Sequence, residues 1–395
     1  MPDLIDIASA RERVLAEARP LGSEAVVLDA ALGRVLAEDV RSPGDLPPFD
    51  SSAMDGYAVV AGAGGELPVV GESRAGAPAA VALEPGQAIR ISTGAQVPGG
   101  ADAVVPVERT EASDGRVRIP DTSRGANIRL AGEDVREGEL VLRAGSDLGP
   151  AELAVLASFG RDDVLCGLSP RVTVLATGDE LVPPGRPLGP GQIRNSNATA
   201  LAALAQRAGA TVVENRIVPD EREATVAALG EALASADLVC VSGGVSVGPH
   251  DHVKPALAEL GVEERFWGVR LKPGKPTWFG AREGVLVFGL PGNPVSAMVT
   301  FHLFARPALR ALAGGEPGDT RASALLDAPV RRNPAREQVI RCRLAARDDG
   351  WHVEPTKEQG SHVLTSMVGA EAFALVPAGE GEFAPGSRVE IELLR

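Results

Sequence analysis

The stretch that most constrains the fold is residues 237–252, DLVCVSGGVSVGPHDH, where a short apolar run stops abruptly in a glycine-rich loop. Residues 238–241 predict a strand buried on both faces. The loop after this strand carries glycines and hydroxyl groups that would let backbone N–H groups approach an anion such as phosphate: Ser242, Gly243, Gly244, Ser246 and Gly248. A helical pattern follows, and Asp251 at its start would bring a carboxylate to the place where an anion and its metal would lie.

Strand, loop and helix alternate from about residue 171 to residue 312, which predicts a doubly wound α/β domain with a mostly parallel sheet. The expected strands are 172–176, 211–218, 238–241, 266–271 and 285–290, and the expected helices are 198–208, 221–234, 252–260 and 295–312. Before this domain the sequence predicts a helix over 4–19, a small all-β unit up to about residue 135, a strand at 139–143 and a helix at 151–159. After residue 317 only strands are predicted, with a hairpin turn at 348–350. The fold class is therefore multidomain, α/β plus β.

Charge and cysteine content exclude several classes of protein. A net charge of −14 argues against binding to a nucleic-acid backbone, and only 3% aromatic residues argue against stacking on single strands. Three widely separated cysteines suggest neither a disulfide framework nor a zinc site. The N-terminus lacks the pattern of a signal peptide, and the one uncharged stretch of membrane-span length, 285–305, is interrupted by Pro291 and Pro294. We therefore expect a cytoplasmic protein without a membrane or nucleic-acid partner.

Four loops that follow predicted strands carry polar or charged residues, and a parallel sheet would bring these loops to one edge. They are TGDEL with Glu180, the Gly/Ser loop with Asp251, LKPGKP with Lys272 and Lys275, and GLPGNPVS with Pro291, Gly292, Asn293 and Ser296. Their convergence is the argument for a binding site. Each loop by itself is also explained as an ordinary tight turn.

Some of these residues have a second explanation. Asn293 and Pro294 are typical of a helix start, which would leave the amides of Val295 and Ser296 free for an anion, although ordinary capping explains the same pattern. Lys272 and Lys275 flank a Pro-Gly turn, so their ammonium groups are expected near one point, unless they are simply solvated.

The acidic residues also have alternatives. Asp220 stands three residues before Glu223 in the register of a capping box, and a capping role is favoured for it. Asp251 is either a helix cap or, because it follows the Gly/Ser loop, a catalytic or Mg²⁺-binding residue. In the first β unit, Asp55, Thr93 and Asp134 are turn residues, and composition alone assigns them no site.

Taken in order, nine motifs of this chain closely resemble the molybdopterin molybdenumtransferase family, which also includes the C-terminal domain of gephyrin. They are FDSSAMDGYAV, RISTGA, NIRLAGED, ATGDEL, GQIRNSN, VSGGVSVGPHD, LKPGKP, GLPGNPVSA and QGSH. The resemblance implies four domains: an elongated one from 1–44 and 136–168, an inserted β domain at 45–135, a molybdopterin-binding α/β domain at 169–316, and a C-terminal β-barrel at 317–395. It also implies a homodimer whose site lies between the α/β domain of one subunit and the inserted domain of the other.

The implied reaction inserts molybdate into adenylated molybdopterin, with hydrolysis of the phosphate anhydride, release of AMP and assistance from Mg²⁺. The loop at 243–248 would hold the phosphates, Asp251 and Glu180 would support the metal or activate water, and Lys272 and Lys275 would neutralise molybdate or the anhydride. The resemblance adds Asp55 to the catalytic residues and Asp134 and Asp220 to the metal ligands. It also places Thr93, Ser296, Arg341 and Ser361 in the site.

Two other functions fit parts of the sequence. A molybdopterin adenylyltransferase would share the α/β domain and use ATP, but it would not need the DGYA unit or the C-terminal barrel. A non-catalytic scaffold of the gephyrin type would bind receptor peptides, but the chain shows no resemblance to the extra domains that accompany such use. If the chain is the enzyme, the adenylyltransferase and the molybdoenzymes that accept the cofactor are its expected partners.

Overall fold

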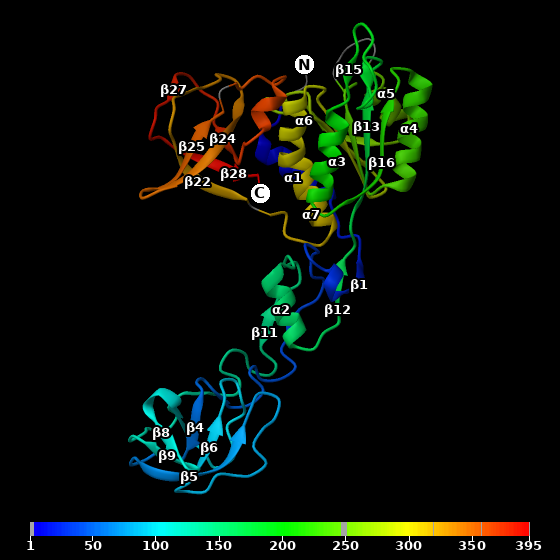
Figure 1. Cartoon of the computed structure of the whole chain (residues 1–395). Helices are drawn as coiled ribbons and strands as arrows, with labels where there is room; N and C mark the ends of the chain where they lie inside the picture. The colour runs from blue at the N-terminus through cyan, green and yellow to red at the C-terminus, as the bar shows by residue number, and fades with distance from the viewer. Residues whose placement is uncertain (1–3, 246–250, 319, 357, 395) are drawn as a thin grey trace. The chain divides into compact units, whose positions relative to one another are not determined.

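We describe the protein from a computed structural model, which covers residues 4–245, 251–318, 320–356 and 358–394 (Figure 1). The chain divides into two compact units. Unit 1 consists of Met1–Glu38, Ala144–Leu153 and Asp163–Arg395, and unit 2 consists of Asp39–Arg143 and Ala154–Asp162. Among the described residues, no helix is long and apolar enough to cross a membrane.

Unit 2 is built around a six-stranded sheet, in agreement with the all-β unit predicted from the sequence. The strand order is β7-β4-β6-β5-β9-β8, with β4 (Gly56–Val59), β5 (Gly65–Ser73), β6 (Ala88–Ile91), β7 (Ala103–Pro106), β8 (Glu111–Ser113) and β9 (Arg116–Ile119). Successive side chains point to opposite faces of a strand, so Tyr57 packs in one buried cluster and Ala58 in another. The unit also contains two short antiparallel pairs and a 3-10 helix: β2 (Val40–Arg41) with β11 (Leu140–Leu142), β3 (Ser51–Ser52) with β10 (Ile128–Arg129), and η2 (Val107–Arg109).

The main sheet of unit 1 has six strands in the order β16-β13-β17-β21-β20-β18. Four of them are parallel, which confirms the predicted doubly wound sheet, and the other two add an antiparallel edge. Their bounds are β13 (Arg171–Thr177), β16 (Thr211–Val218), β17 (Leu238–Ser242), β18 (Glu263–Trp267), β20 (Trp278–Arg282) and β21 (Val285–Leu290).

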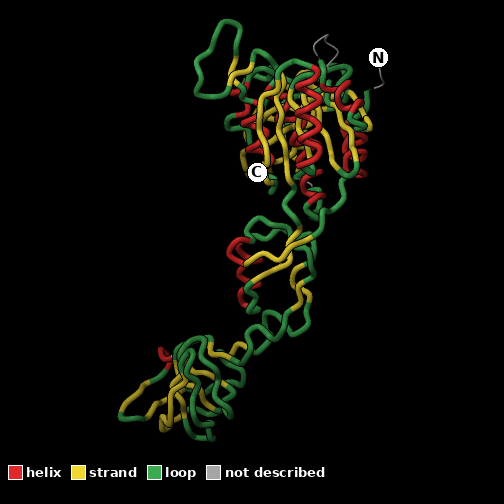
Figure 2. The backbone as a smooth tube through the Cα atoms, turned by 90° about the vertical axis from the view of Figure 1, so that its right-hand side faces the viewer, coloured by secondary structure: helices red, strands yellow, loops and turns green. Residues whose placement is uncertain are grey.

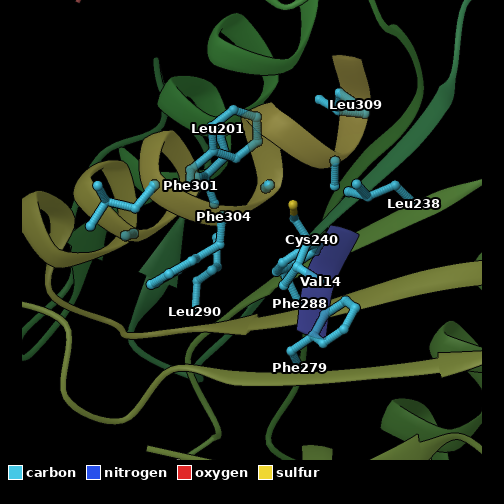
Figure 3. Packing of buried hydrophobic residues seen from close by; sticks show 14 of the residues in the cluster. Val14, Leu201, Leu238, Cys240, Phe279, Phe288, Leu290, Phe301, Phe304 and Leu309 are labelled. Atoms are coloured by element: carbon cyan, nitrogen blue, oxygen red, sulfur yellow. The ribbon is translucent and has the colours of Figure 1, made fainter. Parts of the chain in front are cut away.

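Helices cover both faces of this sheet, as the red helices around the yellow strands show in Figure 2. Residues of β17 alternate between the two faces: Cys240 packs with Val14, Leu201 and Phe304 on one face (Figure 3), and Val241 packs with a different set on the other. The helices of the first face are α1 (Ile7–Glu17), α3 (Asn197–Arg207), α6 (Pro294–Thr300) and α7 (Arg306–Leu312). Those of the second face are α4 (Arg222–Ser235) and α5 (Val253–Glu259).

The C-terminal part of unit 1 is a closed β-barrel, as the sequence predicts. Its strands pair in a ring, β24-β25-β22-β28-β26, which closes because β26 also pairs with β24. The bounds are β22 (Arg321–Leu326), β24 (Glu337–Arg347), β25 (Gly350–Pro355), β26 (Ala372–Val376) and β28 (Arg388–Leu393). The expected hairpin turn at 348–350 joins β24 to β25. A short pair, β23 (Val330–Arg331) with β27 (Glu382–Phe383), and the 3-10 helix η4 (Leu364–Met367) complete this part.

The remaining elements of unit 1 are short. Strand β1 (Ser23–Val27) pairs antiparallel with β12 (Asp163–Gly167), which joins the two flanks of the segment that forms most of unit 2. Strand β14 (Leu181–Val182) pairs with β15 (Ile193–Arg194), and η1 (Leu28–Ala30) is a 3-10 helix. Helix α2 (Pro150–Ser158) belongs to unit 1 up to Leu153 and to unit 2 from Ala154 on. The finer division into four domains implied by the resemblance stays a prediction.

One strand predicted for unit 1 is wrong, and one predicted helix contains an unexpected turn. The strand expected at 266–271 is two strands: β18 ends at Trp267, and β19 (Leu271–Lys272) pairs in parallel with β24 of the barrel. Strand β20 was not predicted. The helix expected over 295–312 is confirmed, because α6, η3 (Phe301–Ala305) and α7 follow one another without a break, but the π-helical turn η3 inside it was not predicted.

Candidate functional site

The carboxyl ends of the four parallel strands open into a cavity of about 570 Å³, within the usual size of a small-molecule site. The loops after these strands bring together residues that the sequence predicted for a site: Glu180, Asp220, Ser242, Gly243, Gly244, Asp251, Gly292 and Asn293. We call this space the carboxylate cavity, after Glu180, Asp220 and Asp251. Ser246 and Gly248 were also predicted here, but they lie outside the described residues.

The glycines at the end of β17 allow the strand ends to approach closely. Gly243 and Gly244 have positive φ angles of +96° and +65°, which disfavour other residues. A Cβ atom at either position would lie 2.9 Å from the Thr177 hydroxyl at the end of β13. Gly178 has a similar role, because a Cβ atom there would collide with the Glu180 carboxylate at 2.5 Å. These glycines keep the floor of the cavity free of side chains, so an anion could reach the backbone.

Asn197 holds two of these loops together, and the sequence reasoning did not single it out. Its side-chain amide, at the start of α3, donates to the Ser242 hydroxyl at 2.9 Å and to the Gly292 carbonyl at 2.7 Å. Asn195 supports the same helix start, because its side-chain oxygen accepts from the Ala198 amide at 3.1 Å. The only signal in the sequence was the NSN run before an apolar helix.

Three carboxylates line the cavity from three different loops. Helix α4 begins at Arg222 with Glu221 as its N-cap, so Asp220 does not have the capping role that the sequence favoured; its amide donates instead to the Asp179 carboxylate at 3.0 Å. Helix α5 begins at Val253 with His252 as its N-cap, so Asp251 is not the cap residue either. Within the described part of the chain, no three acidic, histidine or cysteine side chains form a ready metal-binding group.

A second cavity, of about 580 Å³, meets the first at Asn293. It contains the other predicted residues of unit 1: Lys272, Pro291, Lys275, Ser296, Arg341 and Ser361. Arg336 adds a fourth cation, and no described acidic residue lines this space. We call it the cationic cavity, and its charge suits an oxyanion.

The pairing of β19 with β24 explains how the lysines meet the barrel. Leu271 and Lys272 lie in register with Glu337 and Gln338, so the LKPGKP loop is hydrogen-bonded to the barrel strand that also carries Arg341. Lys272 and Lys275 are exposed, and both line the cavity, as the rigid Pro-Gly turn predicted. This contact joins segments about 65 residues apart, which the sequence pattern does not reveal.

Arg341 is almost completely buried, and it bonds to groups that carry no net charge. Its guanidinium donates to the Ser366 hydroxyl at 3.2 Å and to the carbonyls of Glu358 and Gly360 at 3.1 and 3.2 Å. Burial lowers the pKa of Arg341 to about 10, so the side chain still carries its charge at neutral pH. The carbonyl contacts hold the loop that presents Ser361 to the cavity.

The helix start at Asn293 differs from the sequence prediction in two ways. Asn293 and Pro294 do begin α6, but the Asn293 side chain does not cap the helix; it donates to the Ser361 hydroxyl at 3.2 Å. The Val295 amide, which was expected to be free for an anion, donates to the Ser361 carbonyl at 3.2 Å. The barrel loop thus takes the place of the expected ligand at this amide.

The other three predicted residues belong to unit 2. Asp55 Oδ1 accepts hydrogen bonds from the Thr93 amide at 2.7 Å and from the Thr93 hydroxyl at 3.1 Å. These two bonds lower the pKa of the Asp55 carboxyl, so the carboxylate is favoured. Asp134 is exposed, and its amide donates to the Leu46 carbonyl at 3.0 Å.

Comparison with protein families matches three consecutive parts of the chain. The MoeA N-terminal region (domain I and II) matches residues 5–160, the probable molybdopterin binding domain matches 173–311, and the MoeA C-terminal region (domain IV) matches 323–394. The molybdopterin molybdenumtransferase of Haemophilus influenzae is 36% identical, with 98% of each chain covered. This chain belongs to the molybdopterin molybdenumtransferase family.

Further members of the molybdopterin molybdenumtransferase family agree with this assignment. The protein of that name from Nostoc sp. is 38% identical over 93% of this chain and 88% of its own. Two crystal structures of the molybdopterin biosynthesis protein MoeA from Pyrococcus horikoshii resemble this chain with TM-scores of 0.82 and 0.85, at 33% and 29% identity. They cover 100% and 99% of this chain, and 100% of their own.

Proposed function

We propose that this chain is a molybdopterin molybdenumtransferase, which inserts molybdate into adenylated molybdopterin and releases AMP. The observation that carries the proposal is the pair of cavities that meet at Asn293, one lined by carboxylates and the other by four cations. Carboxylates that bind Mg²⁺ and orient water suit a phosphate anhydride that is to be hydrolysed, whereas lysine and arginine side chains suit a free oxyanion. The full-length relatives bear the enzyme's name, which favours this function over that of an adenylyltransferase or a scaffold.

In the carboxylate cavity, the bare backbone of Gly243 and Gly244 and the Ser242 hydroxyl would hold the phosphates of adenylated molybdopterin. Asp251 and Glu180 would orient a water molecule toward the anhydride and accept its proton. The water oxygen then bonds to one phosphorus, the bridging P–O bond breaks, and AMP leaves. Gly292 and Asn293, from the loop after β21, would close the cavity around the same phosphates.

In the cationic cavity, Lys272, Lys275 and Arg341 would hold molybdate, a dianion. Because the buried Arg341 is fixed by carbonyl groups, it offers a positive charge at a constant position. Ser296, Pro291 and Ser361 would shape the pocket around the oxyanion. The dithiolene of molybdopterin would reach this pocket past Asn293, which lines both spaces.

Residues of the carboxylate cavity fit Mg²⁺. Glu180, Asp220 and Asp251 supply hard oxygen ligands but form no closed three-ligand group, and magnesium usually combines one or two carboxylates with phosphate oxygens and water. Bound there, Mg²⁺ would neutralise charge on the phosphates. Asp134, the fourth proposed ligand, lies in unit 2.

We further propose that the enzyme is a cytoplasmic homodimer that receives its substrate from molybdopterin adenylyltransferase and delivers its product to molybdoenzymes. In the homodimer, Asp55 and Thr93 of one subunit would complete the site of its partner. The hydrogen bonds from Thr93 support this role, because they keep the Asp55 carboxyl ionised and fix its direction.

The test is to incubate the full chain with adenylated molybdopterin, molybdate and Mg²⁺ and to measure AMP and active cofactor. We expect AMP release that depends on molybdate. Asp251→Asn should slow it by about 10²–10³, as expected for a group that acts on developing charge, while Asp348→Asn in the exposed hairpin turn should not. Absence of AMP release, or consumption of ATP with unmodified molybdopterin instead, would refute the proposal.

A further inference from the structure

A third cavity of unit 1, of about 230 Å³, lies away from the two proposed substrate cavities and shares no lining residue with them. It is formed where α3, the π-helical segment η3 and barrel strand β26 come together, through Ala208, Phe301 and Phe373. Its walls are mostly apolar. Two arginines, Arg207 and Arg306, and His302 supply its polar part, and no described acidic residue lines it. We call it the Arg306 cavity.

Arg306 is the unusual member of this group. Its side chain is half-buried, and among the residues that the structure describes its guanidinium has no hydrogen bond or ion pair. Burial lowers the pKa of Arg306, and the neighbouring Arg310, Arg207 and Arg11 act in the same direction. An arginine nevertheless stays charged in proteins, so the site carries a partly desolvated cation whose hydrogen-bond donors are unused.

The buried carboxylate of Glu392, which acts on the charge of Arg306, is paired with other side chains. Glu392 is buried and forms an ion pair with Arg11, and Arg321 lies 3.8 Å from the same oxygen. Its other oxygen lies 3.3 Å from Nε2 of His302, although that contact lacks hydrogen-bond geometry. The carboxylate and Arg11 line an adjoining cavity of about 250 Å³, which shares only His302 and Arg306 with the Arg306 cavity.

His302 adds a second polar side chain to the cavity, and its Nε2 atom faces the Glu392 carboxylate. Its side chain is only 6% exposed, and its Nε2 atom has no hydrogen-bond partner among the described residues. The ring stands edge-on to Phe373, with the two centroids 5.2 Å apart, so it is held in place. His302 therefore forms a fixed part of the cavity wall beside Arg306.

We propose that the Arg306 cavity binds a small organic carboxylate, with the carboxylate on Arg306 and the apolar body between Met298, Phe301 and Met367. A guanidinium presents paired donors that match the two oxygens of a carboxylate. The apolar wall selects against inorganic anions, which would leave that surface uncovered. The volume limits the body to about the size of a phenyl ring with a short chain.

The experiment is isothermal titration calorimetry of the full chain with 3-phenylpropionate and with the neutral 3-phenylpropanamide. We expect saturable binding of the carboxylate to one site and binding of the amide about tenfold weaker or more, because the amide lacks the charge-assisted hydrogen bonds. Inorganic phosphate should not displace the carboxylate. Equal binding of acid and amide, displacement by phosphate, or no saturable binding at millimolar concentration would contradict the proposal.

Variants locate the binding site. Arg306→Gln should weaken binding of 3-phenylpropionate about tenfold or more, whereas Arg343→Gln, the same change at an exposed position of β24, should leave it unchanged. If Arg306→Gln does not fold, Ala208→Leu fills the cavity without removing a charge, and it should abolish binding while circular dichroism confirms folding. Unchanged binding in a folded variant of either kind would overturn the assignment.

Discussion

One side chain, Asn197, connects the loops after β17 and β21, and these loops carry the proposed phosphate-binding residues. Neither its charge nor its spacing distinguished it in the sequence, because an asparagine before a helix is ordinarily a cap. The acidic residues were easier to predict, since the Gly/Ser loop before Asp251 indicated a bound anion. For Asp220 the capping register was misleading, because the helix begins one residue later than that register required.

Removing the Asn197 amide should affect catalysis more than stability. Asn197→Ala loses two hydrogen bonds, each worth about 0.5–1.5 kcal/mol, and frees the Ser242 and Gly292 loops to separate. We expect AMP release to fall by about tenfold or more if the loops move by even an ångström. Asn215→Ala, which loses a bond to the Ala198 carbonyl, is the matched control. Equal activity of the two variants would show that the two hydrogen bonds of Asn197 have no catalytic role.

His352 in the barrel should make stability depend on pH. Its two ring nitrogens lie 2.8 Å from carboxylates of Asp327 and Asp349, and these contacts raise its pKa. The folded state therefore binds the proton more tightly than the unfolded chain. The resulting stabilisation is fully present below the unfolded pKa of about 6.5, and it is lost as pH rises through the higher folded pKa.

The measurement compares unfolding of the native protein and His352→Gln between pH 5.5 and 9. The stability difference in favour of the native protein should shrink as pH rises. Burial lowers the pKa of His302, which titrates in the opposite sense, but both proteins contain His302 and its effect cancels in the difference. A difference that stays constant across this range would show that the two carboxylates do not raise the pKa of His352.

At the scale of elements, the apolar pattern of the sequence predicts the helices and strands that depend mainly on residues near them in the chain. The strands β13, β16, β17 and β21 and the helices between them were predicted because each has its own apolar pattern and its own ends. The pairing of β19 with β24 depends on a partner distant in sequence. Strands β18, β20 and β21 pair with near neighbours along the chain, but β20 was still not predicted. The π-helical turn at 301–305 is apolar like α6 before it, so the hydrophobic pattern does not separate the two.

This π-helical turn carries much of the core that supports the site. Phe304 is completely buried in the core (Figure 3). It packs edge-on against Phe266 at a centroid distance of 6.4 Å. Phe304→Ala should lower the free energy of unfolding of unit 1 by about 3–5 kcal/mol, whereas Val368→Ala, at a 76% exposed position, should change it by less than about 0.5 kcal/mol. Tryptophan fluorescence in urea is suitable, because Trp267, Trp278 and Trp351 all belong to unit 1. Similar losses in both variants would contradict the assignment of the core.

At the scale of the whole molecule, the proposed homodimer would bring Asp55 of one subunit to the site that contains Asp251 of the other. Asp55→Asn and Asp251→Asn should each slow AMP release strongly, since each removes a charge proposed for the reaction. If the two residues belong to one site across the dimer, mixing the inactive proteins under conditions of subunit exchange restores part of the activity. A mixture that is no more active than its components would place both residues in the site of a single chain.

If the two cavities that meet at Asn293 form one site, crystals soaked with molybdate and AMP should contain both ligands there. We predict molybdenum density between Lys272, Lys275 and Arg341, and the AMP phosphate against Ser242, Gly243 and Gly244. Density for either ligand elsewhere, with both cavities left to solvent in a protein that releases AMP, would contradict the account.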